Sequence, residues 1–473
     1  AYQKYVIRPL AALGHNVQDS GKIIGQASGQ AYPQPTSRKV EPIKRGQNKQ
    51  VSALRQFFIL SARNARILTR DRPSMVLMLA VGPIISMLDV VLSFVLGRDL
   101  FNYKTGNIAN VVTSMFMPIM YAVMVGSLAQ MREFVKESEI YKRERLVNLK
   151  VLPYVLSKVW VAALLALYQA LVYTLVHYLA FKMPGGTQEF FLSYITIYLA
   201  TLAGMMLGLA SSAIAPNANA VPLIVIMFLV PQFTLGGAMI PVPDFISGPT
   251  SARWAFEGLM AVSGAGSDVA ADACWDLPKT LRKSLSLEDK ETYGCRCMGI
   301  NVLRQDSCNF PGIGDFYKPV IDQPEPLKPA DLDPQPAEPV IPPPPQEPGK
   351  DADSVAMSEF LLKLKDYQAE VEKIQNGFKA ENETYQAKAD VFAKQMEQYQ
   401  KDLANWEIDR NGAVSAAEGL IEPFNDNFKW TFADKKNEAA YLGKVFRAWL
   451  MQGIIILVLM TLAILLIWRK DKA

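Results

Sequence analysis

Residues 74–97 read SMVLMLAVGPIISMLDVVLSFVLG, an apolar run that a single charged residue, Asp89, interrupts. About 20 helical residues cross the hydrocarbon core of a bilayer, so a run of this length predicts a membrane-spanning helix. The run is too long for the apolar core of a signal peptide. This stretch therefore indicates a membrane protein.

The same pattern recurs along a chain in which half of the 473 residues are hydrophobic and only 20% are charged. In order, the long apolar runs occupy residues 74–97, 109–130, 156–181, 190–214, 219–240 and 448–468. Each run is long enough to cross a bilayer as a helix. We predict an all-α membrane protein with six transmembrane helices and a large extracytoplasmic insertion between the fifth and the sixth.

The placement of lysine and arginine predicts the orientation. Residues 38–72 hold ten of them and residues 131–158 hold seven, whereas the alternate short loops hold only Arg98, Lys104 and Lys182. The positive-inside rule places the basic segments and both termini in the cytoplasm. We expect a multi-pass protein of the plasma (cytoplasmic or inner) membrane. The net charge of +4 reflects this asymmetry, and no basic patch predicts a nucleic-acid partner.

Outside the insertion, composition divides the chain into a cytoplasmic linker, an amphipathic interfacial helix, the first five transmembrane helices, and the sixth with a cytoplasmic tail. These segments are residues 1–50, 51–72, 73–262 and 447–473, in that order. The interfacial helix has Arg63, Arg66 and Arg70 opposite an apolar face, which is typical of a helix lying on the inner leaflet.

The insertion has four predicted parts: a cysteine module, a Pro-rich extended segment, a coiled-coil helix and a return segment. They occupy residues 263–317, 318–350, 351–410 and 411–446. The Pro-rich part should adopt the polyproline II conformation. Two geometries stay open. The extended segment and the helix could form a stalk, or the helix could break near Gly377 into a short antiparallel hairpin.

All four cysteines, Cys274, Cys295, Cys297 and Cys308, lie in the cysteine module. An extracytoplasmic location favours disulfides. We expect two bridges with the pairing left open, except that Cys295 and Cys297 are too close in sequence to pair with each other. A four-cysteine zinc site is the alternative, but the paired C-x-x-C spacing is missing, so we predict no metal.

The helix predicted over 351–410 carries a heptad seam that Glu381 interrupts once. The seam residues are Met357, Phe360, Leu364, Tyr367, Val371, Ile374, Phe378, Tyr385, Ala389, Phe392, Met396, Tyr399, Leu403 and Trp406. Apolar residues at alternating steps of three and four, with polar residues elsewhere, predict a coiled coil. Such a helix could also bind an extracytoplasmic partner.

Motifs for chemistry are missing from the sequence. No G-x-x-x-x-G-K-[ST] loop and no hydrolase, metalloprotease or kinase signature occurs, and the only histidines are His15 and His177. We predict no catalytic residue and no cofactor in this chain. Transport would therefore need an energy source elsewhere.

Five features follow one another along the chain. They are the basic amphipathic helix, the charged loop ESEIYKRERL (137–146), LPYVLSKVW (152–160), PQFTLGGAMIPVPDF (231–245) and SARWAFEGLM (251–260). Together they resemble the type-2 membrane domain of ATP-binding cassette (ABC) exporters, particularly the ABCG (white/brown-like) group. The Pro-rich and coiled-coil insertion departs from that pattern.

The resemblance implies the permease of an ATP-driven exporter, a homodimer in contact with membrane lipid, that moves an amphipathic or lipid-like substrate out of the cytoplasm or inner leaflet. ATP and Mg would bind an ABC ATPase domain, fused upstream or present as a separate subunit, and translocase activity would require that domain. Two other functions stay open: a non-transporting anchor whose coiled coil docks a partner, and an ion-coupled secondary transporter. The second would be expected to show internal repeats and more intramembrane charge, and the sequence has neither.

In such exporters the loop between the second and third spans contacts the ATPase and transmits its motion. Glu137, Tyr141, Arg143 and Glu144 match the family pattern there. Mixed charge suits a polar contact that fixes partner and register. The alternative is a loop that only anchors the membrane surface, for which lysine and arginine would suffice.

The resemblance also implies a translocation path between the second and fifth spans of two protomers. The candidate lining residues are Met115, Phe116, Met120, Phe228, Gln232, Phe233 and Thr234. Methionine and aromatic side chains suit a site that adapts to bulky apolar cargo. Ordinary packing or lipid contact is the alternative for each of them.

Asp89 is the only acidic residue deep in a predicted span, and His177 in the third span could reach it. An intramembrane carboxylate is a candidate functional group. Both a proton relay and a structural role, as a paired or protonated hydrogen-bonded group, are compatible with the sequence.

Overall fold

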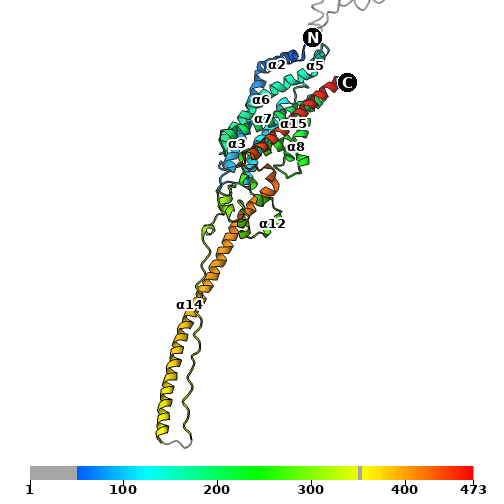
Figure 1. The fold of residues 1–473 in the computed structure, drawn as a ribbon. Coiled ribbons are helices and arrows are strands. Elements are labelled where there is room, and N and C mark those ends of the chain that lie inside the picture. The colour runs from blue at the N-terminus through cyan, green and yellow to red at the C-terminus, as the bar shows by residue number, and fades with distance from the viewer. Residues whose placement is uncertain (1–50, 350–353, 472–473) are drawn as a thin grey trace, which may run out of the picture. The chain divides into compact units, whose positions relative to one another are not determined.

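A computed structural model describes residues 51–349 and 354–471; the predicted linker 1–50, residues 350–353 at the junction of the Pro-rich segment and the helix, and the last two residues lie outside this part. Every regular element in the described part is a helix (Figure 1). Five helices are long and apolar enough to cross a membrane: α3 (Arg72–Leu96), α4 (Ile108–Gln130), α6 (Val151–Ala180), α7 (Thr187–Ile214) and α15 (Glu438–Lys470). The predicted all-α membrane fold is confirmed.

The predicted fifth span differs from the other five. Helix α8 (Val221–Thr234) has only 14 residues, about 21 Å at 1.5 Å per residue, which is less than the hydrocarbon thickness. It ends before a turn in which Gly237 has a φ of 83° and lies against Trp430. A count of six full spans therefore stays a prediction.

The chain after α8 returns to the bundle through α9 (Asp244–Ser247) and α10 (Ser251–Ser263). All residues of α10 are buried. Arg253 fixes this return: its guanidinium donates to Glu257 at 2.7 Å and to Asp244 at 2.6 Å. The indole rings of Trp254 and Trp430 flank the guanidinium. A buried cation is thereby paired and shielded, so the turn after α8 has a defined structure.

Helix α7 occupies the centre of the bundle, and its most extensive contact is with α4. Two glycines one turn apart, Gly204 and Gly208, allow this contact. A β-carbon added at Gly204 would lie 2.5 Å from the carbonyl oxygen of Val123, and one at Gly208 would lie 2.3 Å from that of Ser127. Small residues at this spacing let two helix backbones approach closely in a membrane.

The Ser127 hydroxyl bridges the two backbones, since it donates to the carbonyl oxygens of Val123 at 2.7 Å and Gly204 at 2.9 Å. The sequence analysis did not single out this glycine pair. The close approach of α4 and α7 sets the position of α10, α15 and α6, which all pack on α7.

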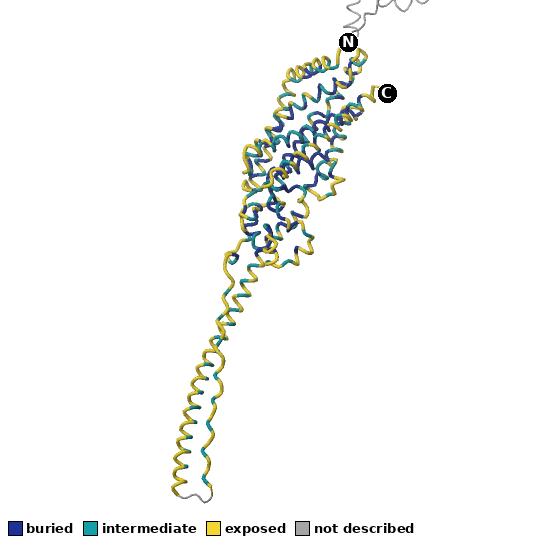
Figure 2. The backbone as a smooth tube through the Cα atoms, viewed as in Figure 1, coloured by how far each residue is buried: buried dark blue, intermediate teal, exposed yellow. Residues whose placement is uncertain are grey.

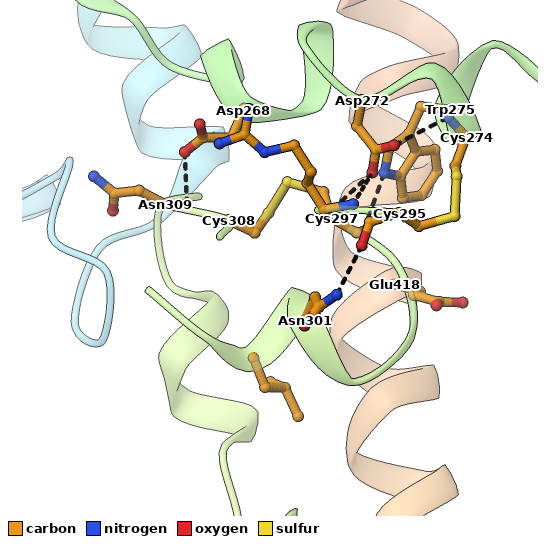
Figure 3. The surroundings of a disulfide bond; sticks show 12 residues. Asp268, Asp272, Cys274, Trp275, Cys295, Cys297, Asn301, Cys308, Asn309 and Glu418 are labelled. Carbon is orange, nitrogen blue, oxygen red and sulfur yellow. Dashed lines mark hydrogen bonds between the residues drawn. A yellow bond between two sulfur atoms is a disulfide. The ribbon is translucent and has the colours of Figure 1, made fainter. Parts of the chain in front are cut away.

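The cysteine module consists of short helices and turns closed by two disulfides, Cys274–Cys295 and Cys297–Cys308. The prediction of disulfides is confirmed, and the pairing follows chain order. Asp272 joins the two bridges, because its carboxylate accepts from the backbone N–H groups of Cys274 and Cys297 (Figure 3). A zinc site would need free thiolates, and all four sulfur atoms are in disulfides.

The short elements of the module, in chain order, are α11 (Ser267–Ala270), η2 (Ala273–Asp276), α12 (Lys279–Ser284), α13 (Leu287–Thr292), η3 (Gly299–Leu303), η4 (Ile313–Phe316) and η5 (Pro319–Asp322), and η6 (Lys429–Thr431) adjoins them. The loop after α3 supports the module, since the Tyr103 hydroxyl donates to the carbonyl oxygen of Leu303. Glu418 attaches the long helix to it by accepting from Lys290 and from the N–H of Gly299.

Helix α14 (Ser354–Phe428) is a single helix of 75 residues. It continues through Gly377, so the hairpin alternative is not observed, and it extends past residue 410 into the predicted return segment. The continuation is helical because Ala413, Val414, Ala417 and Ile421 are buried at its base. The N-terminal part of α14 runs beside the Pro-rich segment (Figures 1 and 2).

The predicted seam is the covered face of α14. From Phe360 to Trp406, every seam residue is partly buried and nearly all others are exposed; Asn382 takes the position next to exposed Glu381. The cover is the Pro-rich segment rather than a second helix of this chain: Trp406 donates to the carbonyl oxygen of Gln323, and Lys318 pairs with Asp409. A coiled coil stays a prediction.

The Pro-rich segment presents every third residue to the helix, apart from one step of four between Leu332 and Pro336. Pro326, Pro329, Leu332, Pro336, Pro339, Pro342, Pro345 and Pro348 are partly buried between exposed neighbours. Three residues per turn is the period of polyproline II. From Gln323 to Gly349 it covers about 80 Å at 3.1 Å per residue, and α14 from Ser354 to Trp406 covers about 78 Å at 1.5 Å per residue. The two legs therefore match in length.

We expect Gly204→Ala and Gly208→Ala each to destabilise the bundle by about 1–3 kcal/mol, because the new methyl group forces α4 and α7 apart. Thermal unfolding of the protein in detergent measures this. Gly443→Ala and Gly453→Ala in α15 are matched controls, since nothing lies within 4 Å of their added β-carbons. Equal stability of all four variants would contradict the role of the glycine pair.

Phe392→Glu together with Tyr399→Glu should detach the Pro-rich segment, because both side chains lie on the covered face of α14. Limited proteolysis should then cut within residues 323–349. Ile408→Glu changes a residue of the same helix that is 69% exposed and should leave protection unchanged. Full protection in the double variant would mean that the seam does not hold the segment.

Candidate functional site

The candidate site is the segment around α5 (Ser138–Arg145), between α4 and α6. Helix α2 (Ala53–Arg70) crosses beside it. Arg63 of α2 donates to Glu144 at 2.5 Å and lies 3.9 Å from Glu137. Two of the predicted coupling residues thus bind a neighbouring helix of the same chain.

Glu137 belongs to a buried cluster. The Lys158 ammonium lies 2.8 Å from Glu137 and 3.2 Å from Glu133, and its side chain is only 4% exposed. Burial alone would raise the pKa of the Glu133 carboxyl, but Lys158 and Lys136 together lower it below its ordinary value. Lys158, counted in the sequence as a surface cation, is therefore an internal partner of the loop.

Tyr141 connects α5 to the end of α15. Its hydroxyl donates to Asp471 at 2.9 Å, and Arg145 donates to the same carboxylate at 2.9 Å. Burial of the ring and this hydrogen bond raise the pKa of the Tyr141 hydroxyl well above its usual value. Through these contacts α5 is attached to α2, α6 and α15 at once.

The free surface of α5 lies elsewhere. Among the four predicted coupling residues only Arg143 is exposed. Directly after the helix, Leu146 is 89% exposed and Val147 is 81% exposed, and Asn148 takes the left-handed conformation with a φ of 73°. An apolar pair on a tight charged turn is a typical protein contact. Leu146 and Val147 were not among the predicted coupling residues, although Leu146 is the last residue of the charged stretch 137–146.

The candidate path residues fall into two groups. Met115 and Phe116 are buried within the protomer, and Phe116 packs edge-on against Phe256. Met120, Phe228, Phe233 and Thr234 are partly buried. Gln232 caps α10, since its amide oxygen accepts from the N–H and hydroxyl of Ser251. The exposed side of α8 instead carries Leu223, Ile226, Met227 and Val230.

Asp89 and His177 meet in the interior: the Nδ1 atom of His177 lies 2.8 Å from the Oδ2 atom of Asp89, and both residues are buried. The contact that the sequence suggested exists.

Comparison with known proteins gives the context for this site. Residues 55–260 match the ABC-2 type transporter family. The chain is also 27% identical over 239 residues to the ABC transporter ATP-binding/permease protein Rv1747 of Mycobacterium tuberculosis (strain ATCC 25618 / H37Rv). That alignment covers 47% of this chain and 27% of the relative, so the chain spans about a quarter of the relative's length. The predicted resemblance to the membrane domain of an ABC transporter is confirmed, and both the export direction and the narrower ABCG group stay predictions.

We expect Lys158→Met to destabilise the domain by about 3 kcal/mol, because it leaves two buried carboxylates without their cation. Lys142→Met removes an exposed pair with Glu139 and should cost below about 0.5 kcal/mol. Thermal unfolding compares the two variants.

The same cluster predicts an acid dependence. The lowered pKa of Glu133 means that its stabilisation is complete above the ordinary pKa of 4.5 and is lost as the pH falls through the folded-state value. The loss should be smaller in Lys158→Met, since Lys158 is a main cause of the lowered pKa. An unchanged acid profile in that variant would contradict the assignment.

Proposed function

We propose, from the match of residues 55–260 to the ABC-2 type transporter family, that this chain is the membrane-spanning permease of an ATP-driven exporter. Its α5 segment would be the contact for an ABC ATPase domain. The relative's name includes an ATP-binding part as well as a permease, which supports an ATPase partner, fused or separate. ATP and Mg would bind that partner.

The observation that carries the proposal is the two-sided character of α5. One side is bound to three other helices through Glu137, Tyr141 and Glu144. The other presents Arg143, Leu146 and Val147 to the surroundings. A force applied to the exposed side would therefore move α2, α6 and the end of α15 together. A loop that only anchors the bilayer surface would not need the buried acidic residues.

The apolar character of the α8 region supports a proposal about the substrate class. We propose that two protomers meet along α8 and move an amphipathic or lipid-like substrate out of the cytoplasm or inner leaflet. The partly buried Met120, Phe228, Phe233 and Thr234 would line the path. Met115 and Phe116 would support its wall from behind, and Gln232 would keep the α8–α10 turn in place.

The alternative of a non-transporting anchor is less well supported. It relied on a coiled-coil seam free to dock a partner, yet the seam of α14 is covered by the chain's own Pro-rich segment. An ion-coupled transporter would be expected to show internal repeats and more intramembrane charge than Asp89 alone supplies.

Leu146→Ser together with Val147→Ser should reduce export at least about tenfold while the permease stays folded, since both side chains are exposed and lost apolar contact area weakens docking. ATP hydrolysis by the complex should no longer respond to substrate. Leu327→Ser, at a residue that is 92% exposed in the Pro-rich segment, is the matched control. Normal export by the double variant would refute the docking role of this turn.

A further inference from the structure

The buried side of α3 is polar, although the helix as a whole is among the most apolar of the chain. Its only buried residues are Gly82, Ser86, Asp89 and Ser93. They recur at steps of three and four and therefore form one face. The apolar side chains lie on the outside, where lipid can solvate them, and the polar face is turned toward α4 and α6.

Helix α6 packs against this face and carries three buried polar residues at four-residue spacing, Gln169, Tyr173 and His177. A β-carbon added at Gly82 would lie 3.8 Å from Gln169 and 3.9 Å from Tyr173, so these residues face each other across the interface. Farther along, His177 binds Asp89. Helix α4 adds Tyr121, whose ring lies 5.1 Å from that of Tyr173.

Most polar atoms in this column have no partner in the described part of the chain. They are the Oδ1 atom of Asp89, the Nε2 atom of His177, the hydroxyls of Tyr121 and Tyr173, and both amide atoms of Gln169. The Tyr121 hydroxyl lies close to the Asp89 carboxylate. Buried polar groups are normally satisfied by protein or by water, and so many in one column indicate a polar occupant.

A cavity of about 600 Å³ leads to the column from the α5 end of the bundle. Its lining includes Glu137 and Lys158 at the charged end, Val81 and Val161 along its walls, and Gln169 at the column. From Lys158 to Gln169 the cavity follows α6 for about 16 Å, and from Gln169 to His177 the column adds about 12 Å. Cavity and column together approach the thickness of the hydrocarbon core, about 30 Å.

We propose that this column is a hydrated path through which water and protons reach the Asp89–His177 pair from the α5 end, making that pair a proton-binding site. The unpartnered donors and acceptors of the column are the kind of groups that an ordered water needs as partners. Tyr121 from α4 lies close to Asp89, and the ring of Phe181 packs against His177. The Nδ1 atom of His177 contacts Asp89, so Nε2 is the ring nitrogen that is left for water.

The path does not depend on the proposed coupling to an ATPase, since it lies within one protomer. Its mouth adjoins the Glu133–Glu137–Lys158 cluster that holds α5, so a movement of α5 would open or close the mouth.

The two-histidine sequence allows a direct test. The full-length protein with His15→Gln, labelled with ¹⁵N-histidine and reconstituted in lipid, gives imidazole signals from His177 alone. We expect magnetisation transfer from water to His177 and rapid exchange of its ring N–H in D₂O. Val161→Phe fills the cavity, and Gln169→Leu removes the first polar side chain of the column. Each should slow the exchange of the His177 ring N–H at least about tenfold.

Leu171→Phe is the control, because Leu171 is on the same helix, 46% exposed and outside the cavity. Slow exchange of His177 in the parent protein would mean a dry, structural pair and would overturn the proposal. Fast exchange that neither Val161→Phe nor Gln169→Leu slows would mean access from another side and would overturn the path. Export need not be measured, so failure here is separable from failure of the proposed function.

Discussion

The close approach of α4 and α7 is the constraint on which the membrane bundle depends. In lipid, helices gain nothing from burying apolar side chains against each other, so packing and interhelical hydrogen bonds must supply the association. Gly204 and Gly208 let the backbones touch, and the Ser127 hydroxyl bonds across the contact. Because α7 also carries α6, α10 and α15, one glycine-lined interface positions most of the bundle.

The insertion contains a helix of 75 residues that is covered by another part of the same chain. An isolated amphipathic helix needs something to cover its apolar seam. Here a polyproline II segment does so, with one of every three residues on the helix. Its rise per residue is about twice that of the helix, so half as many residues cover the same length, and the two legs end together.

At the α5 end, ion pairs hold the helices together, whereas close glycine contacts do so in the centre of the bundle. Arg63, Lys158 and Asp471 come from three different helices and hold the loop between α4 and α6. Their partners on the loop are acidic residues together with Tyr141 and Arg145, and the apolar tip of the loop stays exposed. The cavity that leads to the polar column begins at this cluster, so the cluster is common to the proposed coupling contact and the proposed water path.

The sequence by itself determined the class of fold, the oxidised state of the cysteines and the buried face of α14, because each follows from a local property: run length, residue type or periodicity. The positions of Glu137, Tyr141 and Glu144 could not be predicted, since their partners lie far away in the chain. The same holds for the short α8, which ends where Gly237 meets Trp430, and for the cover of the seam. A heptad pattern records that a helix face is buried but not by what, and only the three-dimensional path of the chain brings the Pro-rich segment to it.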